Sequence, residues 1–272
     1  MLLRLLLILA FLWAVKKLAE KFSSIPILNY HFIEGKGEKA GLSISFQAFE
    51  KQLLHLLKRN CRVISPQDLL ECRKNQTELP SKSVIITFDD GDENFYTMVY
   101  PVLVRYQIPV TMFIITDWIG KPGYLTWEQI HSMTPRLITI GSHTVSHRYL
   151  PDLPFEEIRR ELTESKKILQ EKLNRNIRFF CYPVGGFNAS IREMVKEAGY
   201  EAAFTTNRGR NFRQKDLFAL KRVKMTEDSV KPIAITAKLS GYYQIFNDLF
   251  PKEPGGSEIK PVIAAMSSVP ER

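Results

Sequence analysis

The sequence predicts an α/β fold built on a parallel sheet or barrel. Short apolar runs typical of buried strands alternate along the chain with amphipathic segments of helical spacing. Hydrophobic residues make up 44% of the 272 residues, which is enough for a large core and argues against general disorder. Conspicuous polar groups directly follow several of the apolar runs. In parallel α/β folds the carboxyl ends of the strands share one face, where functional sites are built.

Each predicted element rests on a local pattern. We expect strands at 25–30, 84–88, 110–115, 137–140, 179–182 and 202–206, where apolar residues form short runs. Apolar residues recur at helical spacing over 46–57, 94–106 and 155–173, and two more helices should follow the caps Ser65 and Asn188. Pro101 should kink or interrupt the helix at 94–106 because proline lacks a backbone donor. Such alternation indicates right-handed βαβ units.

The N-terminal region carries an uninterrupted apolar run of eleven residues, from Leu5 to Val15, followed by Lys16-Lys17. A helix that spans a bilayer needs about 20 apolar residues, so this run is short. It matches the core of a secretory signal, but no small-x-small cleavage site follows it. Within residues 1–22 we therefore expect an uncleaved signal anchor or an interfacial helix, with a buried first helix as the alternative.

The overall charge is strongly basic. The formal net charge is +9, from 38 basic and 29 acidic residues. Such a balance suits anionic membranes or acidic polymers. The basic residues are scattered, and no helix-turn-helix, zinc-finger or RNA-binding signature accompanies them, so nucleic acid is not expected as a partner.

Two adjacent carboxylates, Asp89 and Asp90, follow the apolar run Val84-Ile85-Ile86 closely. Burying an unpaired carboxylate costs several kcal/mol, so a strand end that carries two indicates a site rather than a packing solution. Successive side chains along a strand point to opposite faces, so the two aspartates should diverge and take different roles. One could bind a metal while the other handles a proton.

Two histidines four residues apart, His143 and His147, follow another predicted strand. If this segment forms a helical turn, both rings lie on one face and can share a metal ion. Together with the aspartates they predict a metal site, in which two imidazoles and one carboxylate leave positions open for water. Zn²⁺ is the default ion, with Co²⁺, Ni²⁺, Mn²⁺ and Fe²⁺ as alternatives.

These motifs resemble those of the polysaccharide deacetylases of the NodB-homology, carbohydrate esterase 4 type. The segments at 87–91, 142–147 and 180–185 match the family's three motifs, the last as a Tyr-Pro variant, and the likeness runs from about Ile27 to Gly209. The resemblance implies a distorted (β/α) barrel over 25–228, with 229–272 as a partly disordered extension. It also implies hydrolysis of N-acetyl groups from an amino-sugar polymer or glycolipid.

By position, the resemblance implies that Asp90, His143 and His147 bind the metal. It assigns the role of general base to Asp89. The oxyanion would then form between the metal and a backbone N–H, which we place at Val184.

The chain departs from the family pattern at three places, one of which is Val184 in place of the usual aromatic residue. No Leu-x-Leu-His segment, which often carries the general acid, occurs near the C-terminus. His31 follows an early strand instead, as in a rearranged subgroup that acts on poly-N-acetylglucosamine, and we assign the acid to it. Cys181 stands where an arginine usually orients the base; Arg222 is the candidate replacement, although an ordinary surface arginine explains it equally well.

Other residues carry weaker signals. Asp92 and Glu93 are expected to be solvated acids at a helix start. Trp118, Tyr124 and Trp127 could form a sugar-stacking wall, with core packing as the alternative. Cys181 lies in an apolar run and is expected to be a small buried hydrophobe.

We therefore expect a metal-dependent N-deacetylase attached to the membrane by its N-terminal segment. A bacterial inner-membrane location with the catalytic domain outside the cytoplasm fits best, and the sequence leaves a cytoplasmic orientation open. Two alternatives remain. A deformylase or other amide hydrolase acting on a lipid-linked sugar would use the same residues, whereas the changes at Cys181 and Val184 favour a catalytically silent glycan-binding module.

Overall fold

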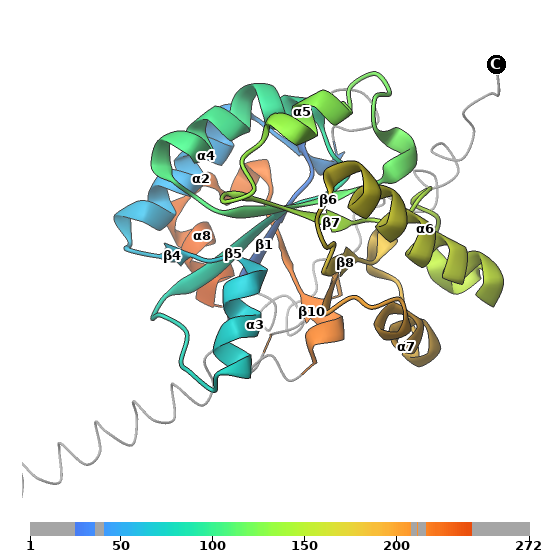
Figure 1. Ribbon diagram of the computed structural model, residues 1–272. Coiled ribbons are helices and arrows are strands. Elements are labelled where there is room, and N and C mark those ends of the chain that lie inside the picture. Colours follow the sequence, from blue (N-terminus) through green and yellow to red (C-terminus); the bar gives the residue numbers. More distant parts are fainter. Residues whose placement is uncertain (1–24, 36–40, 208–210, 212–215, 241–272) are drawn as a thin grey trace, which may run out of the picture.

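The computed structural model describes residues 25–35, 41–207, 211 and 216–240. Its centre is a parallel sheet that curls into a nearly closed barrel, which confirms the predicted α/β barrel (Figure 1). The strands follow the order β10-β9-β8-β7-β6-β5-β1-β11, with β4 paired to the start of β5. They span Ile27–Tyr30 (β1), Arg62–Val63 (β4), Ser83–Phe88 (β5), Val110–Ile114 (β6), Ile138–Ser142 (β7), Phe179–Cys181 (β8), Ala202–Thr205 (β9), Leu220–Lys221 (β10) and Val223–Lys224 (β11). A separate parallel pair is formed by Phe32–Ile33 (β2) and Ser43–Ile44 (β3).

Helices surround the strands on the outside of the barrel (Figure 1). The α-helices span Phe46–Lys58 (α2), Pro66–Lys74 (α3), Tyr100–Tyr106 (α4), Trp127–Ser132 (α5), Phe155–Leu173 (α6), Ala189–Glu197 (α7) and Pro232–Ser240 (α8). The two predicted caps Ser65 and Asn188 are confirmed, and Ser45 caps α2 in the same way: each side chain accepts a backbone N–H from the first turn that follows. The predicted bounds of α6 are also correct.

Pro101 does not interrupt its helix as the sequence suggested. The segment begins as a five-residue π-helix, Phe95–Val99, and changes to α geometry at Tyr100. Pro101 therefore falls in the first turn of α4, where a missing backbone donor costs least.

A single short segment closes the barrel. β10 pairs with β9, and β11 pairs with β1 at the opposite edge of the sheet. Only Arg222 separates β10 from β11. The segment thus bridges the two edges, and Arg222 lies at the junction.

The barrel interior is layered because strand side chains alternate between inside and outside. Its lower layer is apolar, and includes Ile27, Ile85, Phe179 and Leu220. Two residues further along the chain in each case, the inward side chains are polar or, for one cysteine, carry a thiol. They belong to Asn29, Thr87, Cys181 and Arg222. The next inward positions of β1 and β5 are His31 and Asp89. The sequence of each strand therefore leads from an apolar floor to a polar mouth at the carboxyl ends.

The structure describes the start of the predicted C-terminal extension. Part of the predicted C-terminal extension folds onto the barrel: α8 contacts α2, and its Ile235 is fully buried. The predicted N-terminal anchor lies outside the described residues. Among the residues that the structure does describe, no helix has the length and apolar character needed to cross a membrane.

Candidate active site

The polar mouth at the carboxyl ends of the strands brings the predicted site residues together. It joins His31 after β1, Asp89 and Asp90 after β5, His143 and His147 after β7, Val184 after β8, and Arg222 between β10 and β11. The predicted divergence of the two aspartates is confirmed: Asp89 contacts Arg222, and Asp90 contacts the two imidazoles of the histidine pair.

Asp89 forms a bidentate ion pair with Arg222 inside the barrel. Arg222 Nη1 donates to Oδ1 and Nη2 to Oδ2, both at 2.7 Å, and both side chains are almost completely buried. The guanidinium also donates to Asn29 Oδ1 and Thr87 Oγ1, each at 3.1 Å, so the polar layer below Asp89 holds the arginine in place. Arg222 is therefore no surface residue.

The ion pair controls the protonation of Asp89. Burial alone would raise the pKa of this carboxyl, but the charge and hydrogen bonds of Arg222 outweigh it and hold the pKa well below its usual range. Asp89 is accordingly a fully ionised carboxylate at neutral pH. Its orientation is fixed by the two-pronged contact, which leaves its remaining lone pairs to face the mouth.

Cys181 is buried as expected, but it also touches the ion pair. Its Sγ lies 3.0 Å from Arg222 Nη2 and 3.8 Å from Asp89 Oδ2. Burial raises the pKa of this thiol well above its usual value. The small side chain thus leaves room for a guanidinium that enters from the closing segment rather than from β8 itself.

Asp90, His143 and His147 form a compact cluster of metal-ligating atoms. The two Nε2 atoms lie 3.2 Å apart, and Asp90 Oδ1 is 3.5 Å from that of His143 and 3.7 Å from that of His147. Ligands held about 2.0–2.1 Å from a tetrahedral zinc ion lie roughly 3.3–3.4 Å from one another. The separations and the nitrogen and oxygen donors therefore fit a divalent ion such as Zn²⁺.

Both imidazoles are neutral at pH 7, so each can offer a ring nitrogen as a metal ligand. Burial, together with the neighbouring His147, lowers the pKa of His143 to about 3, and burial lowers that of His147 to about 4. His143 Nδ1 lies 2.8 Å from the carbonyl oxygen of Cys181. Donation to that carbonyl places the proton on Nδ1 and leaves Nε2 free to face Asp90, which is the arrangement that metal-binding histidines use.

The two histidines come together without the helical turn that the sequence pattern left open. Residues 143–147 form an irregular loop in which Thr144 and His147 have positive φ, 70° and 62°. Rings from such a loop need support from elsewhere. The buried carboxylate of Glu161, on α6, accepts the backbone N–H groups of Val145 and Ser146 at 2.8 and 3.0 Å.

Glu161 was missed in the sequence, although a signal was present. It occupies the inner face of α6 beside Ile158, Leu162 and Ser165, where a charged residue is unexpected. Only a partner that satisfies the carboxylate explains such a position. Here the partner is the backbone between the two histidines.

His31 lies across the mouth from the histidine pair. Its Nε2 is 3.7 Å from Asp89 Oδ2, and 13% of its side chain is exposed. Burial lowers its pKa to about 4 against the opposing charge of Asp89, so the ring is neutral at pH 7. The residues after it are held by Asp92, which is buried rather than solvated as predicted: its Oδ2 accepts the N–H of Ile33 at 2.9 Å.

Aromatic side chains line one side of the mouth. The ring of Trp118 lies 5.5 Å from that of His147 and 4.9 Å from that of Tyr124, centre to centre. Both rings are half-buried and so present a face near the metal-ligating cluster. Trp127 instead lies under Lys172 of α6, which removes it from the predicted wall.

Val184 adopts a backbone conformation that is unusual for a β-branched residue. Its φ is 56°, and 42% of the residue is exposed at the mouth. Its carbonyl accepts the hydroxyl of Thr206 at 2.9 Å. The following Gly185 also has positive φ, and a Cβ there would lie 2.1 Å from Thr206 Oγ1, so only glycine fits.

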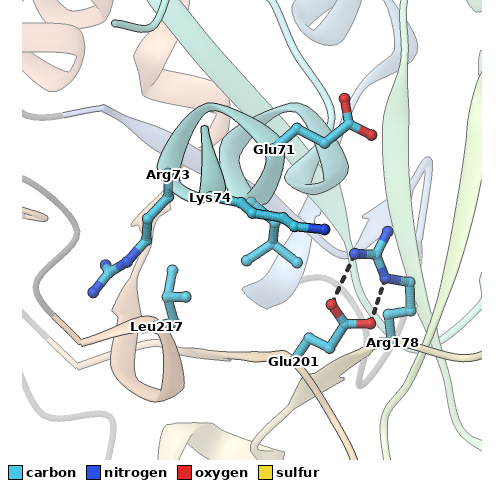
Figure 2. Close-up of a pocket in the computed structure, with 7 residues that line it drawn as sticks. Glu71, Arg73, Lys74, Arg178, Glu201 and Leu217 are labelled. Carbon is cyan, nitrogen blue, oxygen red and sulfur yellow. Dashed lines mark hydrogen bonds and ion pairs between the residues drawn. The ribbon is translucent and has the colours of Figure 1, made fainter. Parts of the chain in front are cut away.

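A separate pocket opens at the other end of the barrel. Figure 2 shows it beneath the end of α3, beside the ion pair of Arg178 and Glu201. None of its lining residues belongs to the polar mouth. The candidate active site is therefore the mouth and not this hollow.

Sequence comparisons agree with the geometry. Residues 76–203 match the family model of polysaccharide deacetylases. YxkH of Bacillus subtilis, named as a polysaccharide deacetylase, is 31% identical over 76% of this chain and 73% of its own length. The poly-β-1,6-N-acetyl-D-glucosamine N-deacetylase of Staphylococcus aureus is 27% identical over 70% of this chain and 74% of its length. The Escherichia coli enzyme of the same name is 24% identical, and this chain covers only 34% of it.

Solved structures show the same likeness. The Streptococcus pyogenes deacetylase PplD, solved with acetate, superposes with a TM-score of 0.73 at 26% identity, over 80% of this chain and 98% of that one. IcaB from Ammonifex degensii superposes with a TM-score of 0.70 at 29% identity, over 79% and 97% of the two chains. Fold, motifs and relatives together establish that this chain belongs to the polysaccharide deacetylase family.

Proposed function

We propose that this protein is a divalent-metal-dependent hydrolase that removes N-acetyl groups from an amino-sugar polymer of the poly-N-acetylglucosamine kind. The observation that carries the proposal is the pairing of a three-donor cluster, Asp90, His143 and His147, with a separately held carboxylate, Asp89. Relatives named for this activity support the choice of substrate. The acetate that accompanies PplD supports an acetyl product.

The residues divide the work of amide hydrolysis. Asp90, His143 and His147 would hold the ion, which when bound polarises the amide carbonyl and lowers the pKa of a water molecule. Asp89, fixed by Arg222, accepts the proton of the attacking water. The backbone N–H of Val184, at the edge of the mouth, would donate to the developing oxyanion.

His31 would deliver a proton to the departing amine. Because the ring is neutral at pH 7, it must first gain that proton during the reaction. Its Nε2 lies 3.7 Å from Asp89 Oδ2, so the proton that Asp89 takes from water has a short path to His31. One proton leaves the water and one reaches the amine, and the two side chains return to their starting states.

Release of acetate tests this proposal. The full chain, stripped of metal and reloaded with Zn²⁺ or Co²⁺, should release acetate from β-1,6-linked N-acetylglucosamine oligomers. His31→Gln should lower kcat by about 10²–10⁴-fold, as expected for loss of a general acid. Asp152→Asn, an exposed acid at the same barrel end, is the matched control and should leave kcat unchanged.

Three results would contradict the proposal. Release of formate from an N-formyl sugar, with no acetate, would make the protein a deformylase. Oligomer binding without turnover under every metal tested would identify a silent glycan-binding module. Equal turnover with and without metal would remove the role of the three-donor cluster.

A further inference from the structure

The two ends of the barrel carry opposite charge. We compare the segments that leave β1, β4, β5, β6, β7, β8 and β11, up to the first turn of the α-helix that follows each, with those that run from the last turn of each helix α2–α7 to the next strand. Among the described residues, the first set contains thirteen acidic and four basic side chains, and the second contains eleven basic and five acidic ones. In the part of the chain that the structure describes, the catalytic end is therefore acidic, and the opposite end, here called the basic end, is positive.

The basic end is also hollowed. The pocket of Figure 2 has a volume of about 510 Å³, and its wall includes Arg73, Lys74 and Arg178. Leu70 and Leu217 contribute its apolar part and pack against the lower core. Glu71 and Glu201 also line the pocket, and Arg178 pairs with Glu201, so the lining carries three basic and two acidic side chains and adds only a small net positive charge to this end.

The N-terminal segment of the chain joins the barrel at this same end. β1 begins at Ile27, in the lower layer of the barrel, and Ile25 packs in the same apolar cluster. The described chain therefore begins at the basic end, and residues 1–24 precede this point in the sequence. They include the apolar run Leu5–Val15 and the lysines that follow it.

We propose that the basic end docks on an anionic lipid bilayer, with the acidic catalytic end turned away from it. Three features point to this surface: the excess of positive charge, the start of the described chain at this end, and the acidic mouth at the far end. Each lysine or arginine near an anionic membrane surface strengthens binding about fivefold. An anionic bilayer repels the acidic end, so the charge separation also sets the orientation.

Lysine labelling in vesicles tests the proposal. The full chain is incorporated into phosphatidylcholine vesicles with or without phosphatidylglycerol, and exposed lysines are labelled with an amine-reactive reagent and read by mass spectrometry. Lys58, Lys74 and Lys82 report on the basic end, and Lys121 and Lys231 on the catalytic end. Labelling of the first three should fall severalfold with phosphatidylglycerol and recover in high salt, whereas the last two should stay fully reactive.

Charge reversal provides the matched control. Lys58→Glu with Lys74→Glu should restore labelling of Lys82 in the anionic vesicles. Lys121→Glu with Lys231→Glu changes the net charge equally and should leave Lys82 protected. The proposal is overturned if both ends are protected alike, if phosphatidylglycerol has no effect, if the chain does not bind vesicles, or if a soluble polyanion protects Lys82 while vesicles do not. None of these readouts depends on the acyl group that the enzyme removes.

Discussion

Asp89 and Asp90 are neighbours in the chain but lie in opposite electrostatic settings. Asp89 is held by the guanidinium of Arg222 through two hydrogen bonds, deep in the barrel. Asp90 faces two imidazoles that burial keeps neutral, with atomic separations suited to a shared cation. The protein itself supplies the positive charge that accompanies the first carboxylate, and leaves a place beside the second for a metal ion.

The difference shows how one short motif can give two functions. Alternation along β5 sends consecutive side chains in different directions, and the barrel then determines what each one meets. A fixed internal cation makes Asp89 a rigidly oriented carboxylate that is ionised at neutral pH. Neutral nitrogen donors make Asp90 part of a site whose charge can be completed from solution.

Removing the carboxylate of Asp89 should have the largest effect on activity and stability. Asp89→Asn removes the proton acceptor and leaves Arg222 buried without its counter-charge. We expect kcat to fall by about 10²–10⁴-fold and the free energy of unfolding to fall by roughly 3–5 kcal/mol. Acetate release and denaturant unfolding measure the two effects.

A double variant separates stability from catalysis. Asp89→Asn with Arg222→Met removes the stranded charge and should recover most of the lost stability, because a buried ion pair can be replaced by uncharged side chains at little net cost. Activity should stay lost. Recovery of activity would show that Asp89 does not accept the proton.

Removing the carboxylate of Asp90 should leave the fold intact but weaken metal binding severely. Asp90→Asn keeps the shape of the side chain and deletes one anionic ligand. We expect bound zinc, measured by elemental analysis, to be largely lost, while unfolding of the metal-free protein changes by less than it does for Asp89→Asn. A loss of stability in the metal-free protein that matches Asp89→Asn would erase the contrast between the two aspartates.

The histidine pair and Asp89 should change the free energy of unfolding in different pH ranges. In the metal-free protein the pKa values of His143 and His147, about 3 and 4, lie below the ordinary value near 6.5. The unfolded chain therefore binds more protons between these limits, and the free energy of unfolding should rise as pH rises from about 4 to about 6.5. The pKa of Asp89 is also lowered, so its contribution is complete above about 4 and is lost only below that pH.

Chemical unfolding across this pH range measures the effect. In a variant with His143→Ala and His147→Ala, the rise between about 4 and 6.5 should become shallower, whereas the loss at lower pH should persist. An unchanged slope would show that the two imidazoles titrate normally.

Removing the side chain that supports the loop of His143 and His147 should lower metal affinity moderately and leave the ion pair of Asp89 unchanged. Glu161→Gln replaces the carboxylate that accepts the N–H groups of Val145 and Ser146. Loss of such outer support lowers metal affinity by about 10–100-fold. Calorimetric zinc titration measures it, and Glu164→Gln, on the exposed side of the same helix, is the control.

The smallest effect is expected at Val184. Val184→Gly relieves the positive φ of a β-branched residue and should raise the free energy of unfolding by up to about 1 kcal/mol. The backbone N–H is retained, so kcat should change little. A large fall in kcat would assign a role to the exposed side chain itself.

The sequence predicted the barrel and the main site residues because both follow from local patterns. Apolar runs that end in Asp89, His143 or Pro183 report a buried strand and its functional end together. The metal-ligating cluster could be inferred because each of its members belongs to a short motif.

What the sequence could not show was set by long-range contacts. Arg222 gave no local sign of burial, because its partner lies 133 positions away in the chain. Asp92 looked like a solvated helix-start acid, and its burial depends on the backbone of Ile33, 59 positions away. The shape of the loop that carries His143 and His147 could not be inferred, because it depends on Glu161 of α6.

The closure of the barrel by residues 220–224 gives the order of synthesis a consequence for activity. A chain that has emerged only as far as β9 already contains every member of the three motifs. It lacks Arg222, so Asp89 has no internal cation to keep it ionised inside the barrel. The same short segment that seals the sheet therefore also supplies the cation that orients Asp89, so the polar mouth is complete only when the barrel is shut.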